Sequence, residues 1–325
     1  MGHSSPRTQP LASLLLAIVV AGGLAGGGTP VLAAQAAFDA QAMQAELERS
    51  GLSPADQLQR MRGQADAFYA KGDYANAARA LQWEVQGAER AGKPPAEDRL
   101  LLLKDCYAHL NDGNALAWSL EKLVTWYPKK TYWGELLDRT QDRPDFGQPL
   151  ALDVNRLRFL TGTLHGPAGY VNLASQAQQA GYPAEALRVL DRGFADGVLG
   201  TGPDAAHQRE LRAQIAGQAA QQASLLAQPA AERDALASKD GEDLVRLGFA
   251  YVTQGQPEKG LALMEQGLRK PLLDKRPQYA RLRLGIAALQ AGQRAKALSA
   301  FANVGGRHGA ADLARLWGLY TRNLG

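Results

Sequence analysis

The sequence lacks most of the patterns that mark enzymes and metalloproteins. It contains a single cysteine, Cys106, among 325 residues, so no disulfide can form within the chain. HExxH, CxxC, GxSxG and phosphate-loop motifs are all missing. The five histidines are far apart and share no motif. We therefore expect a protein that is not an enzyme, with no catalytic residue, no bound cofactor and no metal site.

The sequence also has little excess charge and few aromatic residues. Lys and Arg number 36 against 32 Asp and Glu, and Phe, Trp and Tyr make up 7%. The only adjacent lysines are Lys129 and Lys130. Nucleic-acid-binding proteins usually carry a basic stripe or cluster, so we expect no nucleic-acid partner. The hydrophobic residues, 46% of the total, are rich in Ala and Leu, which suits closely packed helices.

One long apolar run occurs, near the N-terminus, over residues 11–20. A Gly-rich stretch follows it, and Ala34 and Ala36 are small residues at the −3 and −1 positions of a cleavage site. We expect residues 1–36 to be a secretory signal peptide and the mature protein to be periplasmic, without a membrane span. The alternative is an uncleaved anchor over Leu11–Leu32. No cysteine follows the run, which excludes a lipoprotein.

Three segments repeat one spacing of small and apolar residues: Tyr170–Gly193, Leu244–Gly267 and Arg281–Val304. We number each unit so that the first residue of these segments is position 4. Leu then occupies position 7, Gly or Ala position 8, Gly position 15, and Gly or Ala position 20. Positions 4, 7, 8 and 11 share one helical face, and positions 20, 24 and 27 share another. The glycine at 15 allows a left-handed turn, and the small residues at 8 and 20 allow two helices to cross closely. The spacing predicts helix–turn–helix units.

This spacing resembles the tetratricopeptide repeat (TPR). The resemblance implies an all-α, right-handed α-solenoid of helix-turn-helix repeats. The separation of Ala186, Gly260 and Ala297 gives a 37-residue unit, which predicts a further turn and second helix around Ala223. Earlier units contain Gly72 with Ala77, and Gly113 with Ala117 one residue out of phase.

We expect about seven TPR-like repeats, with a capping helix at each end of the array. The expected divisions are a leading helix in 37–57, a solenoid over 58–308 with degenerate repeats near 130–165 and 204–236, and a C-terminal capping helix in 309–325.

A narrower resemblance concerns the middle and late repeats. The segments 170–199 and 240–270 are similar to repeats of periplasmic TPR proteins that accompany TonB–ExbB–ExbD energy-transduction systems in Gram-negative bacteria. The similarity extends over roughly Gln64–Val304. It implies a periplasmic accessory of energised outer-membrane uptake, with no assigned active site.

Two sets of residues are candidate partner-binding sites. The first is an aromatic cluster beside an irregular loop: Trp126, Tyr127, Tyr132 and Trp133. Trp and Tyr dominate interface hot spots, although these side chains could instead pack the junction between repeats. The second set lies at positions of the late repeats that face the inner groove: Phe249, Tyr279 and Ile286. These side chains are exposed apolar groups unless neighbouring helices or the cap cover them.

The sequence thus predicts a scaffold or adaptor that binds protein or peptide segments of envelope proteins, and the narrower resemblance implies an accessory role in TonB-dependent transport. The alternative is an envelope enzyme or a small-ligand receptor with a site between the halves of the solenoid. The sequence carries no signal for the oligomeric state.

Overall fold

The computed structural model describes residues 40–272, 276–306 and 309–324, and the expected signal peptide lies outside them. These residues form α-helices and one short 3-10 turn, and no strand occurs within them. The helices are α1 (Ala40–Arg49), α2 (Pro54–Ala70), α3 (Tyr74–Arg90), α4 (Glu97–His109), α5 (Gly113–Trp126), α6 (Lys130–Gln141), η1 (Gln148–Leu150), α7 (Ala151–Thr161), α8 (Gly166–Gln179), α9 (Pro183–Ala195), α10 (Ala205–Leu226), α11 (Pro229–Ala237), α12 (Gly241–Thr253), α13 (Pro257–Gly267), α14 (Pro277–Gln290), α15 (Arg294–Ala302) and α16 (Ala310–Arg322).

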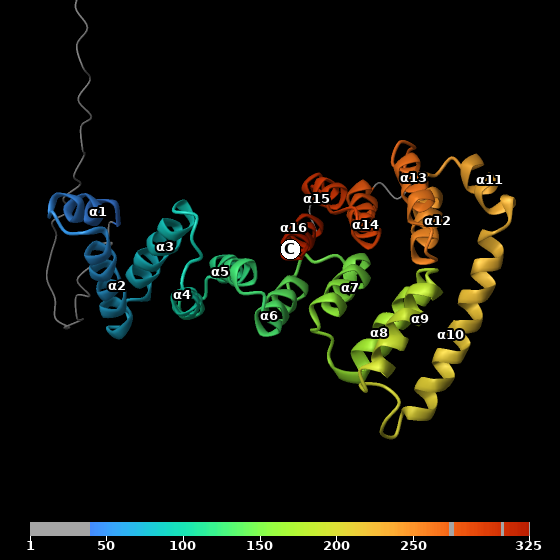
Figure 1. The fold of residues 1–325 in the computed structure, drawn as a ribbon, viewed down its shortest axis with the longest axis horizontal. Helices are drawn as coiled ribbons and strands as arrows, with labels where there is room; N and C mark the ends of the chain where they lie inside the picture. The colour runs from blue at the N-terminus through green and yellow to red at the C-terminus, as the bar shows by residue number, and fades with distance from the viewer. Residues whose placement is uncertain (1–39, 273–275, 307–308, 325) are drawn as a thin grey trace, which may run out of the picture. The chain divides into compact units, whose positions relative to one another are not determined.

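Successive helices pack in pairs along the chain, as Figure 1 shows. From α2/α3 to α14/α15 the described residues make seven helix pairs, with α1 before them and α16 after them. This all-α repeat architecture is the one that the sequence predicts. Helix α2 begins at Pro54, where the Ser53 hydroxyl accepts a hydrogen bond from the Asp56 backbone N–H at 3.2 Å. The boundary expected at 57/58 therefore falls within its first turn.

Most turns inside the pairs depend on one left-handed residue. Gly255 has φ of +82° and stands five residues before the buried Gly260. The same spacing recurs for Gly72, Gly181 and Gly292. In α4/α5 the left-handed residue is Asn111, with φ of +53°, and not Gly113. The prediction that Gly113 is the turn residue of this unit, one residue out of phase, is therefore wrong. Asparagine also tolerates the left-handed conformation, so Asn111 takes that place.

The predicted close crossing is present in α12/α13. A Cβ atom added to Gly248 would lie 2.4 Å from the Gly260 carbonyl oxygen, and one added to Gly260 would lie 2.4 Å from the Gly248 carbonyl oxygen. No side chain fits between backbones this close, so glycine at both positions allows the contact. In α14/α15 the glycine that corresponds to Gly248 is Gly285, and it lies against the ring of Phe301.

The prediction of a turn before Ala223 is wrong. Residues 205–226 form one continuous helix, α10, and Ala223 is exposed on it. Counting back from Ala223, the turn position falls on Gln218, and the neighbouring Gly217 keeps a helical conformation. The second helix of this pair is the short α11, which begins at Pro229. The expected degenerate segment is a helix pair, but its turn comes later.

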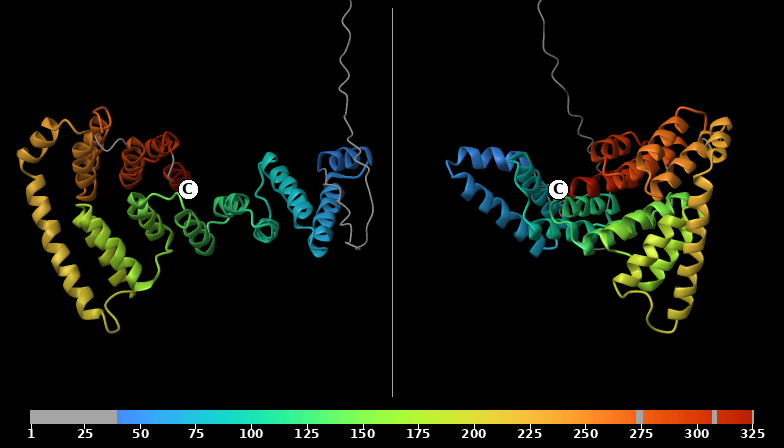
Figure 2. Two further views of the ribbon diagram at one scale, coloured as in Figure 1. Left: turned by 180° about the vertical axis from the view of Figure 1, so that it is seen from behind. Right: turned by 45° about the vertical axis from the view of Figure 1, so that its right-hand side comes forward.

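The C-terminal helix α16 contacts α14 and α15 and also reaches back to α5. Arg315 pairs with Glu121 of α5 at 2.8 Å, and the Asn323 side-chain amide donates to the Val124 carbonyl at 2.6 Å. Just before α16, Gly309 lies against the ring of Phe146. The cap therefore connects the last repeat with α5 and with the loop after α6, and the two views in Figure 2 both place α16 beside α5.

Candidate functional site

Three residues of the predicted aromatic cluster lie half-buried where α5 and α6 meet the preceding repeat. The Trp126 indole N–H donates to Glu89 at 3.2 Å, and the Tyr127 hydroxyl donates to the Pro95 carbonyl at 2.8 Å. The Tyr132 hydroxyl donates to Glu97 at 2.5 Å. Burial, together with this bond to a carboxylate, raises the pKa of Tyr132 to about 12, so the phenol stays protonated. The polar atom of each ring is thus fixed by the chain itself.

The fourth residue of that cluster, Trp133, is different. It is buried, and its ring meets Tyr320 of α16 edge-on, with centroids 6.3 Å apart. Its predicted alternative role, packing the junction, is the one that the structure shows. The structure therefore keeps Trp126, Tyr127 and Tyr132 together near the surface and places Trp133 in the core.

Of the two possibilities for the late groove, the structure shows the one in which neighbouring helices cover its residues. The exposed fractions of Phe249, Tyr279 and Ile286 are 0%, 5% and 1%. Phe249 is covered by Tyr182, the residue just before α9, with ring centroids 4.7 Å apart, and by the Arg156 guanidinium 4.4 Å from its ring centroid. Helices α7 and α9 from the middle of the chain thus cover the positions that the repeat pattern places on the inner groove.

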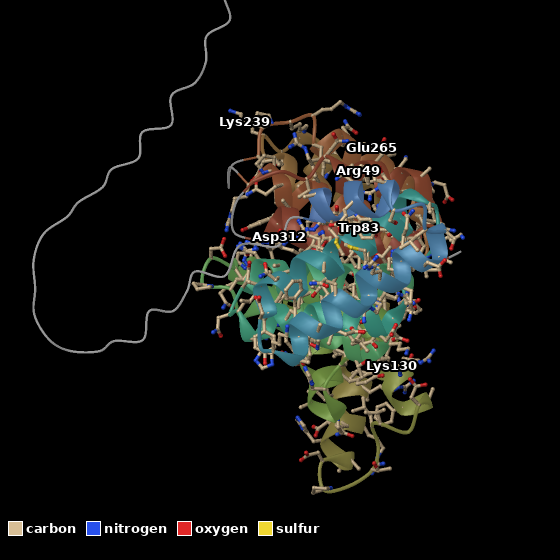
Figure 3. All side chains as sticks on the ribbon, turned by 90° about the vertical axis from the view of Figure 1, so that its left-hand side faces the viewer. Arg49, Trp83, Lys130, Lys239, Glu265 and Asp312 are labelled. Atoms are coloured by element: carbon tan, nitrogen blue, oxygen red, sulfur yellow. The ribbon has the colours of Figure 1, made fainter. Side chains whose placement is uncertain are left out.

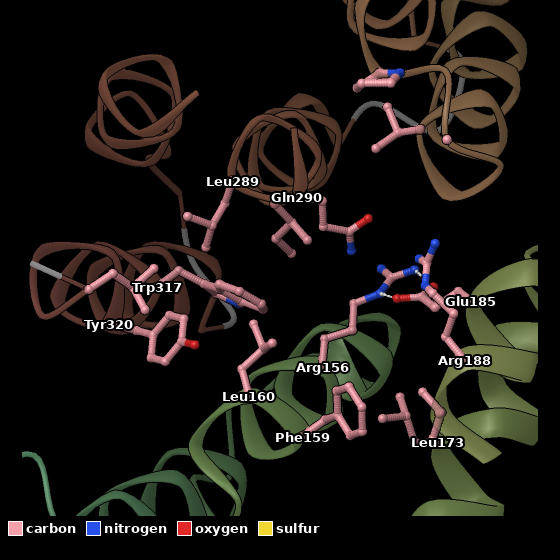
Figure 4. Close-up of a pocket in the computed structure, with 16 residues that line it drawn as sticks. Arg156, Phe159, Leu160, Leu173, Glu185, Arg188, Leu289, Gln290, Trp317 and Tyr320 are labelled. Atoms are coloured by element: carbon pink, nitrogen blue, oxygen red, sulfur yellow. Dashed lines mark hydrogen bonds and ion pairs between the residues drawn. The ribbon is translucent and has the colours of Figure 1, made fainter. Parts of the chain in front are cut away.

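Part of this inner side is not filled. A cavity of about 620 Å³ lies among α7, α8, α9, α12, α14 and α16 (Figure 4). Its walls are mostly apolar, and they include Phe159, Leu160, Leu173, Val189, Val252, Ile286, Leu289, Trp317, Tyr320 and Leu324. Ile286 of the second predicted set thus borders this cavity.

The polar corner of the cavity is built on a buried ion-pair cluster. Arg156 of α7 makes two bonds to the Glu185 carboxylate of α9, at 2.6 and 2.8 Å, and one to Asp153 at 2.6 Å. Burial alone lowers the pKa of Arg156, but the two carboxylates outweigh it and hold the pKa above its ordinary value. Arg156 is therefore charged, and its charge is neutralised inside the protein.

Arg188, one turn along α9 from Glu185, also lines the cavity. Its Nη1 donates to the Thr253 carbonyl at 2.6 Å, and among the described residues no carboxylate lies within ion-pair distance of it. Although Arg188 is exposed, partial desolvation by the surrounding protein lowers its pKa, and it stays charged as arginine does in proteins. The indole N–H of Trp317, in the wall of α16, is buried and has no hydrogen-bond partner in the described structure. The Trp317 N–H is enclosed by the protein, so Arg188 is a lining residue that keeps hydrogen-bond donors for a ligand.

Arg156, Glu185 and Arg188 are not among the site residues that the sequence predicts. A signal was available in α7, where Arg156 and Arg158 interrupt an apolar segment and both are buried. Two arginines that are two residues apart lie on different faces of a helix. If neighbouring helices cover that helix on several sides, at least one of the two arginines must be buried in a packed interface. The carboxylate partner of Arg156 is 29 residues further along the chain.

Three further observations bear on the predicted absences. Within the described residues, no three His, Cys, Asp or Glu side chains gather as metal ligands would. No described helix is both long and apolar enough to cross a membrane. The exposed residues Lys130 and Lys239 lie well apart, as Figure 3 shows, so these two do not contribute to one basic cluster.

Comparison with known proteins gives only distant structural likeness. No protein-family model matches the chain, and no curated protein matches it. Among solved structures, a thermophilic TPR protein of Thermus thermophilus is 17% identical, with 82% of this chain and 100% of that chain covered and a TM-score of 0.24. A tetratricopeptide repeat protein from Parabacteroides merdae is 12% identical, with 82% and 99% covered and a TM-score of 0.29. Scores this low carry no functional comparison, so function has to be argued from the surfaces and the cavity of this chain.

Proposed function

We propose that this protein is a scaffold or adaptor that binds segments of other proteins and performs no catalysis. The observation that supports it is the arrangement of Trp126, Tyr127 and Tyr132 at the surface between two repeats. Hydrogen bonds to the preceding repeat hold each ring in one orientation. Rings that are already fixed lose little freedom when a partner covers them, and Trp and Tyr supply much of the energy of protein interfaces.

A second aromatic group extends this surface along α5. Trp118 is half-buried one turn before Lys122, whose ammonium lies 5.3 Å from the Trp118 ring centroid. Lys122 also pairs with Glu89 at 2.8 Å, the same carboxylate that accepts from Trp126. The partner surface that we propose is therefore a strip of Trp118, Lys122 and Trp126 on α5, continued by Tyr127 and Tyr132. We call it the aromatic strip.

The proposed setting is the periplasm of a Gram-negative bacterium, with the protein as an accessory of TonB-dependent energy transduction. The apolar run and small-residue cleavage site near the N-terminus support export. The similarity of the middle and late repeats to periplasmic TPR proteins supports the TonB link. Cell fractionation and the mass of the exported chain test the first point, with a mature N-terminus at Ala37 as the expected result.

Crosslinking in intact envelopes tests the scaffold. We expect the chain to capture defined proteins reproducibly, with TonB, ExbB or ExbD among them if the transport role is correct. Replacing Trp126 and Tyr132 together by Ala is expected to reduce capture, since an exposed hot spot contributes about 2 kcal/mol or more to binding. The matched control replaces both by Phe, which keeps an aromatic ring at each position and removes the hydrogen bonds to Glu89 and Glu97. Equal capture by the Ala pair, the Phe pair and the unchanged chain would show that the aromatic strip binds no partner.

The cavity favours a second candidate function, a receptor for a small ligand. It lies among helices from the middle and the end of the array, and Arg188 in its lining donates only to the Thr253 carbonyl among the described residues. Ligand pockets in proteins typically have volumes of about 300–1,000 Å³, and this cavity falls in that range. Recovery of a tightly bound small molecule from the purified protein, without any captured protein, would make this candidate the leading one.

A further inference from the structure

The apolar part of the cavity reaches the surface at two leucines. Leu160 and Leu324 are 44% and 49% exposed, and both line the cavity. Large apolar side chains that are left uncovered beside a hollow favour an apolar ligand that covers them. Deeper walls from Phe159, Ile286 and Leu289 continue the same apolar surface inward. The shape of this lining suits a flexible hydrocarbon chain better than a polar molecule.

Another side of the cavity carries two arginines, Arg156 and Arg188. Arg156 cannot provide the charge, because Glu185 and Asp153 already bind three of its N–H groups. Arg188 has only the Thr253 carbonyl as a partner, at 2.6 Å. A carbonyl oxygen satisfies one donor and carries no full charge, and the nearby Glu185 carboxylate, which offsets part of the Arg188 charge, is already bonded to Arg156. In Figure 4 the Arg188 and Arg156 side chains lie together at one side of the cavity, with Trp317 and Tyr320 across from them.

An apolar chain that ends in a planar anion would complement both sides. The guanidinium fork matches a carboxylate through two parallel hydrogen bonds, and such charge-assisted bonds are about twice as strong as neutral ones. We propose that the cavity binds an alkyl carboxylate, with its carboxylate on Arg188 and its chain against Phe159, Leu160 and Leu289. This inference rests on the second candidate function, the small-ligand receptor, and is independent of the aromatic strip.

Calorimetric titration of the delipidated full chain with dodecanoate tests the proposal. We expect saturable binding of one molecule per chain. Replacing Arg188 by Gln removes the charge and is expected to weaken binding about ten-fold or more, in line with the loss of a charge-assisted pair. Arg188→Lys keeps the charge without the fork and should lie between the two. The matched control is Arg246→Gln, which removes the same charge from an exposed position of α12 that lies outside this cavity.

A second variant and a second ligand keep the test decisive if Arg188→Gln does not fold. Leu289→Trp fills the cavity from a half-buried position and is expected to abolish binding. Dodecan-1-ol has the same chain and no charge. Its affinity for the unchanged protein is expected to be lower than that of dodecanoate by about ten-fold or more. Equal binding of the alcohol and the carboxylate overturns the carboxylate assignment but leaves the receptor function standing. Absence of saturable binding by both ligands, or equal loss in Arg188→Gln and Arg246→Gln, overturns the site itself.

Discussion

Helix pairs α12/α13 and α10/α11 are neighbours in the chain and have opposite constructions. In α12/α13 two helices of 13 and 11 residues meet at a glycine-to-glycine contact, and nine residues of α12 are buried. In α10/α11 the first helix runs for 22 residues, the second has nine, and no described residue of α11 is buried. Both pairs contain a glycine near the middle. The comparison shows that the position of a glycine relative to the turn and the crossing decides its effect.

Three glycines of these two pairs have different surroundings. Gly260 lies at a backbone contact, Gly255 has a left-handed conformation with open space around it, and Gly217 has a helical conformation with open space around it. The same substitution, Gly to Ala, therefore tests three physical effects separately. Urea unfolding followed by circular dichroism measures each change in the free energy of unfolding.

The largest effect is expected for Gly260→Ala. Its Cβ would lie 2.4 Å from the Gly248 carbonyl oxygen and 2.6 Å from a Val252 methyl group, so α12 and α13 must separate. Overpacking of this kind costs about 1–3 kcal/mol of stability. We expect a loss of about 3 kcal/mol here, because the added methyl group meets backbone atoms. A loss below that of Gly255→Ala would contradict the contact described here.

A smaller loss is expected for Gly255→Ala. No atom lies within 4 Å of the added methyl group, but φ of +82° disfavours any residue with a Cβ. The cost of a left-handed L-residue is about 1 kcal/mol. The unfolding midpoint of this variant should lie between those of the unchanged chain and Gly260→Ala. A midpoint equal to that of the unchanged chain would mean that the turn is not left-handed.

Gly217→Ala is expected to have the opposite sign. The residue lies in the interior of α10, has ordinary helical φ and meets nothing within 4 Å. Alanine in an exposed helix interior is more favourable than glycine by about 0.5–1 kcal/mol, chiefly through the unfolded chain. The unfolding midpoint should therefore rise. Destabilisation would indicate a turn beside this position, since the 37-residue spacing places one at Gln218.

The smallest effect is expected for Asn111→Gly in the turn between α4 and α5. Asparagine at φ of +53° carries little strain, so glycine should change the free energy of unfolding by about 0.5 kcal/mol or less. Asn111→Val provides the contrast, because β-branched residues are disfavoured there. If the two variants have equal stability, Asn111 is not the turn residue.

Local spacing in the sequence was sufficient for the fold and insufficient for the site. The recurring Leu, Gly and Ala positions predicted helix pairs, and the turns at Gly181, Gly255 and Gly292 occur where that spacing places them. The prediction failed at 204–236 because repeat length was used where no glycine stood at the turn position. A helix continues through Gln218 because nothing in the local sequence stops it.

The site depends on contacts between distant parts of the chain. Phe249 is buried because α7 and α9 pack on it, and no repeat pattern contains that information. The cavity combines side chains from Arg156 to Leu324. The aromatic cluster was easier to find, since its four residues lie within one short segment, although burial separated Trp133 from the other three. Whether the remaining three bind a partner stays a prediction.

The bridge from α16 to α5 has a consequence for the order of folding. In a plain solenoid each repeat contacts only its neighbours, so folding can start anywhere and spread. The pair of Glu121 and Arg315 joins residues 194 apart, and the Val124–Asn323 bond joins residues 199 apart. Contacts this distant form late, because the whole intervening chain must be in place. A chain that emerges N-terminus first therefore keeps that face of α5 open to solvent, and to any chaperone that recognises it, until α16 arrives.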